Sequence, residues 1–244
     1  MQGNKELKTV QKIRRFVEAR LSPEGELGLH LTAGIVVLLV AAWIFAELAE
    51  AVMGAQQITV LDQQVAQWFN RHAVGWLTPA LVVVTHLHSV IGIVVLCASL
   101  ALYFYVKQAR YWLLTLLVAM PGGMLLNVLL KYTFVRARPV FDEPLIHLTL
   151  SSYSFPSGHT ATATILYGII GAYLMCRTSQ WSMRSAIAVG TVLMVVLVAF
   201  SRVYLGAHYL SDVLAAMVES SGWLAVCITA SSTLRRRRES RGLR

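Results

Sequence analysis

Three short polar clusters interrupt the apolar stretches of this 244-residue chain, and each contains residues that can do chemistry. The clusters are Lys131 with Arg138-Pro139, then Pro156-Ser157-Gly158-His159, and then Ser201-Arg202 followed by His208 and Asp212. Arginine and lysine bind the oxygens of anions such as phosphate, and histidine exchanges protons near neutral pH. Together these residue types predict a site that binds a phosphate group and transforms it.

The spacing of His208 and Asp212 places both side chains on one face of a helix. Asp212 can then accept a hydrogen bond from one ring nitrogen and aim the other at a substrate, which makes the imidazole a nucleophile. Attack on phosphorus would form a covalent phosphohistidine. His159, when protonated, could donate its proton to the leaving oxygen and later activate water. We therefore expect His208, His159 and Asp212 to be the catalytic residues.

Five further residues are expected to bind the substrate. Lys131, Arg138 and Arg202 would hold the charged oxygens of the transition state. The backbone amides of Ser157 and Gly158 would assist them, because a predicted helix begins here and a helix start presents free N–H groups and the positive end of its dipole.

The sequence offers no cluster suited to a metal. Asp142 and Glu143 are adjacent and stand alone. Cys97, Cys176 and Cys227 lie inside apolar stretches without the spacing of metal ligands, so we expect small buried hydrophobic side chains. The prediction is a site without metal or cofactor.

The composition is that of an integral membrane protein. The chain is 57% hydrophobic with only 14% charged residues and a mean hydropathy of +0.62, whereas about a quarter of the residues of a soluble domain are charged. A net charge of +9 could suggest nucleic-acid binding, but the cations gather at the two ends of the chain, beside apolar stretches. That distribution indicates membrane orientation and contact with lipid headgroups, so no nucleic-acid partner is expected.

Six apolar stretches predict six transmembrane helices in one all-α bundle. They cover residues 27–46, 90–106, 111–130, the hexapeptide Phe155–Thr160 onward to Cys176, 185–200 and 210–234, with a turn over 201–209. Between the first two spans, residues 56–72 predict an interfacial helix on the outer face and residues 73–88 a shallow segment beside it.

The distribution of the 21 Lys and Arg residues sets the orientation. Most of them fall in the termini and in two short loops, which places both termini in the cytoplasm. Residues 1–26 then form a cytoplasmic amphipathic segment, 27–234 the six-span domain and 235–244 a basic cytoplasmic tail. Four of the five cations left on the outer face flank the hexapeptide, and they need an anion.

Four other polar residues receive structural interpretations. We expect Arg136 to extend from a helix end or contact lipid headgroups, His88 to be a satisfied interfacial histidine and His147 to lie in a solvated loop. Glu219 lies inside the sixth span, where an unpaired charge is costly, so it is protonated, paired or close to the bundle axis.

The three clusters resemble the signature of the type 2 phosphatidic acid phosphatase family: Lys, six residues, Arg-Pro; then Pro-Ser-Gly-His; then Ser-Arg, five residues, His, three residues, Asp. The resemblance covers roughly residues 30–232. It implies metal-independent dephosphorylation of lipid phosphates or diphosphates, with His208 as nucleophile and His159 as acid. Related soluble haloperoxidases hold vanadate with the same residues but lack this membrane architecture.

The outward-facing motifs and the inside-positive charges predict a bacterial-type inner-membrane enzyme whose site faces the periplasm. The expected substrates are undecaprenyl diphosphate and phosphatidylglycerol phosphate. A lipid A phosphatase or a lipid phosphotransferase would use the same site, and a lipid transporter or flippase would bind the phosphate without transforming it. The residues leave the lipid, the phosphoryl acceptor and the oligomeric state open.

Overall fold

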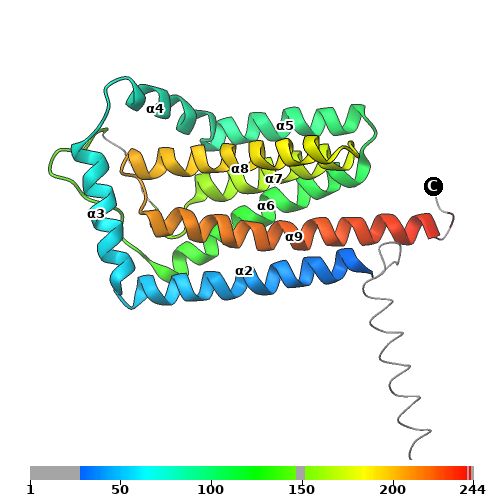
Figure 1. Ribbon diagram of the computed structural model, residues 1–244, viewed down its shortest axis with the longest axis horizontal. Helices are drawn as coiled ribbons and strands as arrows, with labels where there is room; N and C mark the ends of the chain where they lie inside the picture. Colours follow the sequence, from blue (N-terminus) through cyan, green and yellow to red (C-terminus); the bar gives the residue numbers. More distant parts are fainter. Residues whose placement is uncertain (1–27, 147–151, 241, 243–244) are drawn as a thin grey trace, which may run out of the picture.

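The computed structural model describes residues 28–146, 152–240 and 242, and its regular structure over these residues is entirely α-helical. Six helices run side by side along the long axis (Figure 1): α2 (Leu29–Met53), α5 (Val90–Val106), α6 (Arg110–Phe134), α7 (Gly158–Cys176), α8 (Trp181–Tyr204) and α9 (Leu210–Ser240). Helix α3 (Gln57–Arg71) crosses one end of this bundle, and α4 (Leu77–Leu87) lies beside the same end. The predicted segments 1–26 and His147 lie outside the described residues.

The bundle has the composition of a membrane domain. Within the described residues, five helices are long and apolar enough to cross a bilayer, and α4 with α5 would add a sixth span if this pair, bent by 58°, counts as one. Helix α2 shows the pattern most clearly, because its best window has a mean hydropathy of 2.3 although only 6% of it is buried within the protein. Apolar residues exposed in this way suit contact with lipid. The predicted all-α membrane class is confirmed.

Several helices extend beyond the predicted spans. Helix α2 continues to Met53 and includes Glu47 and Glu50, and α9 continues to Ser240 through part of the basic segment. Helix α8 continues to Tyr204, so Ser201 and Arg202 lie in its last turn rather than in the predicted loop. A helix satisfies its own backbone hydrogen bonds, and this remains favourable where the chain leaves the apolar layer.

Helix α7 is the central element, packed between α6, α8 and α9. Gly168 lets α9 approach closely, since a Cβ atom there would lie 2.3 Å from Leu224 Cδ2. A cluster of buried apolar side chains from α5, α6, α7 and α9 surrounds this contact. The start of α7 is thereby fixed relative to the helices that carry the other polar clusters.

A group of aromatic rings holds the loop before α7. The ring of Phe155 is fully buried, with its centroid 5.7 Å from that of Phe45 on α2 and 5.3 Å from that of Phe134 on α6. Aromatic pairs at these separations stabilise a contact by about 0.5–1.5 kcal/mol beyond the burial of area. The Pro156–His159 cluster is therefore anchored to two other helices before α7 begins.

Candidate active site

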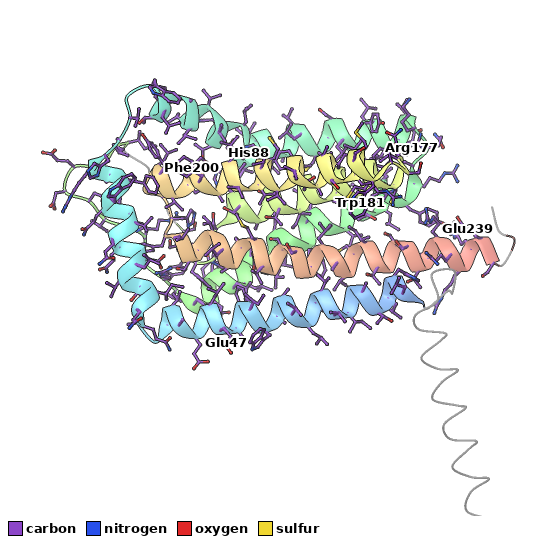
Figure 2. All side chains as sticks on the ribbon, viewed as in Figure 1. Glu47, His88, Arg177, Trp181, Phe200 and Glu239 are labelled. Carbon is purple, nitrogen blue, oxygen red and sulfur yellow. The ribbon has the colours of Figure 1, made fainter. Side chains whose placement is uncertain are left out.

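A cavity of about 300 Å³ opens between α5, α6 and α7. Six of the eight predicted site residues line it: Lys131, Arg138, Gly158, His159, Arg202 and His208. The other two, Ser157 and Asp212, are fully buried behind this lining. Figure 2 locates this region, since His88, which also lines the cavity, lies nearer the α3 end of the bundle, whereas Arg177, Trp181 and Glu239 lie at the opposite end.

His208 is held in the turn between α8 and α9 by its own backbone, whose N–H donates to Arg202 O at 3.2 Å. Its ring Nδ1 lies 3.3 Å from Asp212 Oδ2, and Nε2 lies 3.2 Å from Nη1 of Arg138. Burial lowers the pKa of His208 to about 3, although the hydrogen bond to Asp212 acts in the opposite direction. The ring is therefore neutral at physiological pH, with the Nδ1 proton donated to Asp212 and a lone pair on Nε2.

The carboxylate of Asp212 is fixed by donors on both oxygens. Oδ2 accepts from the hydroxyl of Ser154 and, at 2.9 Å, from the backbone N–H of Tyr209. Oδ1 accepts from Nη1 of Arg136 at 2.5 Å. This set of contacts allows Asp212 little movement, so the orientation that it gives the ring of His208 is well defined.

Lys131 and Arg202 are buried rather than extended to the membrane surface, and Arg138 is half-buried. Nζ of Lys131 donates to Tyr153 O at 2.6 Å, so this side chain does not extend outward from the helix end. Arg138 donates to Ser152 O at 2.8 Å and to Ala207 O at 2.7 Å. Both cations thus tie the loop before α7 to the site.

Arg202 is the most informative of these cations. One of its nitrogens donates to the hydroxyl of Thr85 on α4, while its buried Nε has no hydrogen-bond partner among the described residues. A buried charged donor without a partner is costly, and a bound anion would satisfy it. The cavity therefore has the electrostatics of a phosphate site.

The two amides predicted to assist phosphate binding differ. The N–H of Ser157 donates to the backbone oxygen of Asp212 at 3.1 Å, and its hydroxyl accepts from Thr160. The expectation that the Ser157 amide faces the substrate is therefore wrong, because the loop folds back onto the first turn of α9. Gly158 begins α7 and lines the cavity. His159 follows it, and its ring forms no hydrogen bond with any described residue, so it is free to exchange protons with a substrate.

Sequence reasoning missed two important residues. Arg136 does not contact headgroups: its guanidinium bridges Asp212 and, at 2.7 Å, Asp62 on α3. The carboxylate of Asp62 is 1% exposed. A signal was available for each, since Arg136 is one of the outer cations that needed an anion and Asp62 is the only acid between residues 56 and 72.

His88 and Glu219 each form hydrogen bonds within the protein. His88 is buried rather than interfacial, and its two ring nitrogens are satisfied by Val84 O and the hydroxyl of Tyr167, each at 2.8 Å. Glu219 accepts a hydrogen bond of 2.7 Å from Asn127, whose side chain also lines the cavity. The other carboxylate oxygen of Glu219, Oε2, is buried and has no hydrogen-bond partner among the described residues.

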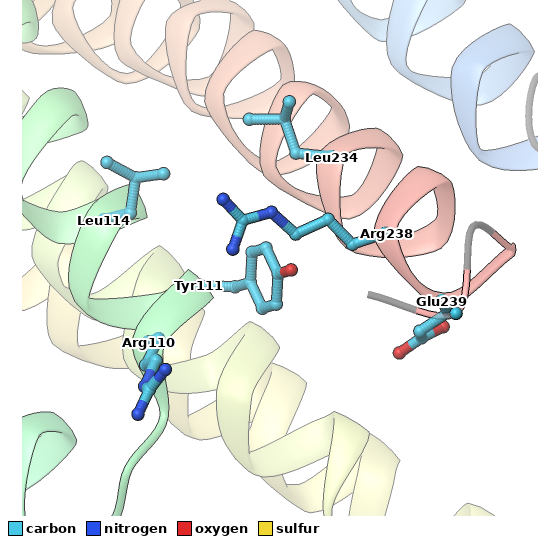
Figure 3. Close-up of a pocket in the computed structure, with 7 residues that line it drawn as sticks. Arg110, Tyr111, Leu114, Leu234, Arg238 and Glu239 are labelled. Atoms are coloured by element: carbon cyan, nitrogen blue, oxygen red, sulfur yellow. The ribbon is translucent and has the colours of Figure 1, made fainter. Parts of the chain in front are cut away.

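A larger cavity, of about 650 Å³, lies at the opposite end of the bundle between α6 and α9 (Figure 3). Arg238 extends from α9 toward Tyr111 on α6, and Glu239 lies near the rim. None of the predicted catalytic or binding residues lines this cavity. The three polar clusters meet at the smaller cavity, which is therefore the candidate active site.

The chain is similar to several known proteins. The profile of the PAP2 superfamily matches residues 112–236. Phosphatidylglycerophosphatase B of Bacillus subtilis is 37% identical over 145 residues, which are 57% of this chain and 68% of that protein. The undecaprenyl-diphosphatase of Sulfolobus acidocaldarius is 32% identical over 128 residues, 51% of this chain and 54% of that protein.

Two solved structures have a similar fold. The crystal structure of a transmembrane PAP2 type phosphatidylglycerolphosphate phosphatase from Bacillus subtilis matches with a TM-score of 0.65 and 29% identity, covering 79% of this chain and 94% of that one. The crystal structure of Aquifex aeolicus LpxE matches with a TM-score of 0.53 and 19% identity, covering 69% and 94%. At that identity the second match shows the fold alone.

Proposed function

Because this chain belongs to the PAP2 superfamily, we propose that it cleaves a phosphate from a membrane lipid through a phosphohistidine formed at His208. The protein is a membrane lipid phosphatase. One observation supports the mechanism most strongly: a neutral, buried His208 is oriented by Asp212 in a cavity that Lys131, Arg138 and Arg202 also line.

The first step forms a bond between Nε2 of His208 and phosphorus, and the bond from phosphorus to the lipid oxygen breaks. His159 donates a proton to that leaving oxygen. The ring of His208 becomes positively charged, and the carboxylate of Asp212 stabilises it. In the second step water attacks phosphorus, His159 takes the proton from water, and free phosphate leaves with His208 restored.

Three cations would hold the transferring group. Lys131, Arg138 and Arg202 all line the cavity, and the partnerless Nε of Arg202 gives the phosphate a donor that is otherwise unused. Arg138 would have a second role, because its Nη1 lies 3.2 Å from Nε2 of His208. A charged phosphate oxygen is a stronger acceptor than a ring nitrogen, so substrate binding would draw this donor away and free the nucleophile.

The lipid chain would leave the cavity sideways, between α5 and α6. The lining here is apolar: Val90 and Val94 on α5 face Met124 and Val128 on α6. These four side chains are 69%, 60%, 40% and 44% exposed, respectively, so the cavity wall continues onto the surface that would meet the bilayer. A lipid could thus present its headgroup phosphate without leaving the membrane.

We assign six spans to the chain, counting α4 and α5 as one bent span, with both termini in the cytoplasm. Arg177 and Arg184 flank the loop between α7 and α8, which lies at the same end of the bundle as the basic end of α9. The positive-inside rule makes this the cytoplasmic end. The catalytic cavity then faces the periplasm of a bacterial inner membrane.

The names of the relatives favour undecaprenyl diphosphate or phosphatidylglycerol phosphate as the substrate. The test is phosphate release by the purified protein from a panel containing these two lipids and phosphatidic acid, with and without a chelator. We expect release that the chelator leaves unchanged, an acid-labile labelled phosphoenzyme, and loss of both in His208→Ala.

The matched control is His72→Ala, which removes an exposed histidine outside the cavity and should retain full activity. Undiminished release by His208→Ala would contradict the phosphohistidine mechanism. Release that disappears with the chelator and returns with added divalent metal would contradict metal independence.

A further inference from the structure

We propose that Asp62, on the helix that crosses the end of the bundle, is a positioning residue for the reaction and acts on His208 through Arg136 and Asp212. The proposal rests on the proposed role of His208 as nucleophile. Asp62 does not line the catalytic cavity, and it comes from α3, a helix that contributes none of the three polar clusters.

One guanidinium joins the two carboxylates. Nη2 of Arg136 lies 2.7 Å from Asp62 Oδ2, and Nη1 lies 2.5 Å from Asp212 Oδ1. The side chains are nearly inaccessible to water, with exposed fractions of 12% for Arg136, 1% for Asp62 and 0% for Asp212. Bonds of this kind are short and directional, so the position of Asp62 sets the position of the guanidinium and, through it, of Asp212.

Ser211 provides a second link from Asp62 to the same turn. Its backbone N–H donates to Asp62 Oδ1 at 2.9 Å, and its hydroxyl contacts Oδ2. Nη1 of Arg136 also donates to the hydroxyl of Ser211 at 2.8 Å. The first turn of a helix has N–H groups without partners inside the helix. Asp62 therefore caps the start of α9 from another helix, one residue before Asp212.

The charges explain why a second acid is useful here. If Arg136 were paired with Asp212 alone, the pair would be neutral and would stabilise a positive charge on His208 only weakly. Asp62 shares the guanidinium, so the three groups together carry one net negative charge. That charge lies on the Nδ1 side of His208, whose ring becomes positive when Nε2 bonds to phosphorus.

Apolar contacts also hold α3 in place, beside this network. Val65 and Phe69 of the same helix pack against buried apolar side chains of α8 and α9. Buried ion pairs contribute little net stability compared with apolar packing of similar volume. The structure therefore assigns the network to the geometry and charge of the site rather than to attachment of the helix.

The test is Asp62→Asn, which keeps the size and the acceptor for Ser211 but removes the charge. We expect kcat to fall about tenfold, as for other residues that act through a catalytic neighbour, with KM within about twofold of the wild-type value. The same change is then made in an Asp212→Asn background, and the rate of phosphoenzyme formation is measured in a single turnover. Asp62→Asn should not lower this rate further, because the route from Asp62 to His208 is already broken. Gln63→Ala, at the next and exposed position of α3, is the matched control and should retain full kcat.

A wild-type kcat in Asp62→Asn would overturn the positioning role. So would a fall in the rate of phosphoenzyme formation in the Asp212→Asn background as large as the fall that Asp62→Asn causes alone. If Asp62→Asn does not accumulate in the membrane, Arg136→Lys replaces it, since one ammonium cannot bridge both carboxylates; unchanged kcat there overturns the proposal as well. Activity retained by His208→Ala would refute the proposed mechanism and this inference with it, whereas an inactive His208→Ala beside a fully active Asp62→Asn refutes the inference alone.

Discussion

At the scale of single residues, the two neighbours of His208 act on its ring in opposite directions. The carboxylate of Asp212 favours the protonated form, while the guanidinium of Arg138 and burial disfavour it. Burial has the largest effect, and it lowers the pKa of His208 from the ordinary value near 6.5 to about 3. A histidine that must attack phosphorus benefits, because the protonated ring has no lone pair to use.

We therefore predict that His208 does not titrate between pH 5 and pH 8. Because its pKa is lowered, the neutral form is kept as the pH falls through 6.5, and the proton is taken up only near pH 3. The ring nitrogen shifts of His208 in an NMR titration of the labelled protein should stay constant over that range. A midpoint for His208 above pH 6 would be inconsistent with the buried, neutral ring.

Residue types and spacing were enough to predict six of the residues that line the cavity, but not the network behind it. The link from Asp62 to Arg136 joins positions far apart in the sequence, and no pattern states which face of α3 meets α9. The Ser157 amide illustrates the opposite error. Its place at a helix start predicted a free N–H, and only the packing of the loop on Asp212 shows that this donor is used.

At the scale of elements, the turn between α8 and α9 decides where His208, the proposed nucleophile, lies. Gly206 adopts φ +71°, a left-handed conformation that favours glycine, and a Cβ atom there would lie 2.6 Å from the ring of Phe141. His208 follows two residues later, with its backbone N–H bonded to Arg202 O. Any adjustment at Gly206 therefore shifts the ring relative to Asp212.

Gly206→Ala should reduce kcat at least tenfold, because the left-handed conformation costs an alanine about 1–2 kcal/mol and the turn relieves that strain by moving. Gly190→Ala on α8 is the control, since a Cβ atom at that position meets nothing within 4 Å. Steady-state kinetics of the two purified variants measures the difference. Equal activity in both would show that the turn accommodates a side chain without displacing His208.

Apolar periodicity predicted the helices well and their ends poorly. Residues 90–106 were predicted and observed as a helix with the same bounds. Helix α2, in contrast, continues past Glu47, because hydropathy reports where the apolar layer ends and not where backbone hydrogen bonding stops. The shallow segment 73–88 contains helix α4. Thr85, in the last turn of α4, accepts a hydrogen bond from Arg202.

At the scale of the whole molecule, the proposed orientation can be tested with thiols at the two ends of the bundle. Cys176 is exposed at the end of α7, and Val140, in the loop after α6, is 91% exposed at the α3 end. In intact spheroplasts a membrane-impermeant maleimide should label Val140→Cys in a Cys176→Ser background. The native Cys176 should react only after permeabilisation. The reverse pattern would place the catalytic cavity in the cytoplasm.

Helix α9 has a consequence for the membrane in which the enzyme works. Asp212 lies in its first turn and Arg235 near its far end, about 35 Å apart at 1.5 Å per residue. The hydrocarbon core of a bilayer is about 30 Å thick. With the arginines anchored among the headgroups of one leaflet, the length of the helix sets the depth of the cavity in the other leaflet. Bilayers of longer acyl chains should therefore draw the cavity below the plane of lipid phosphates and slow turnover, so that membrane thickness becomes a control on the rate.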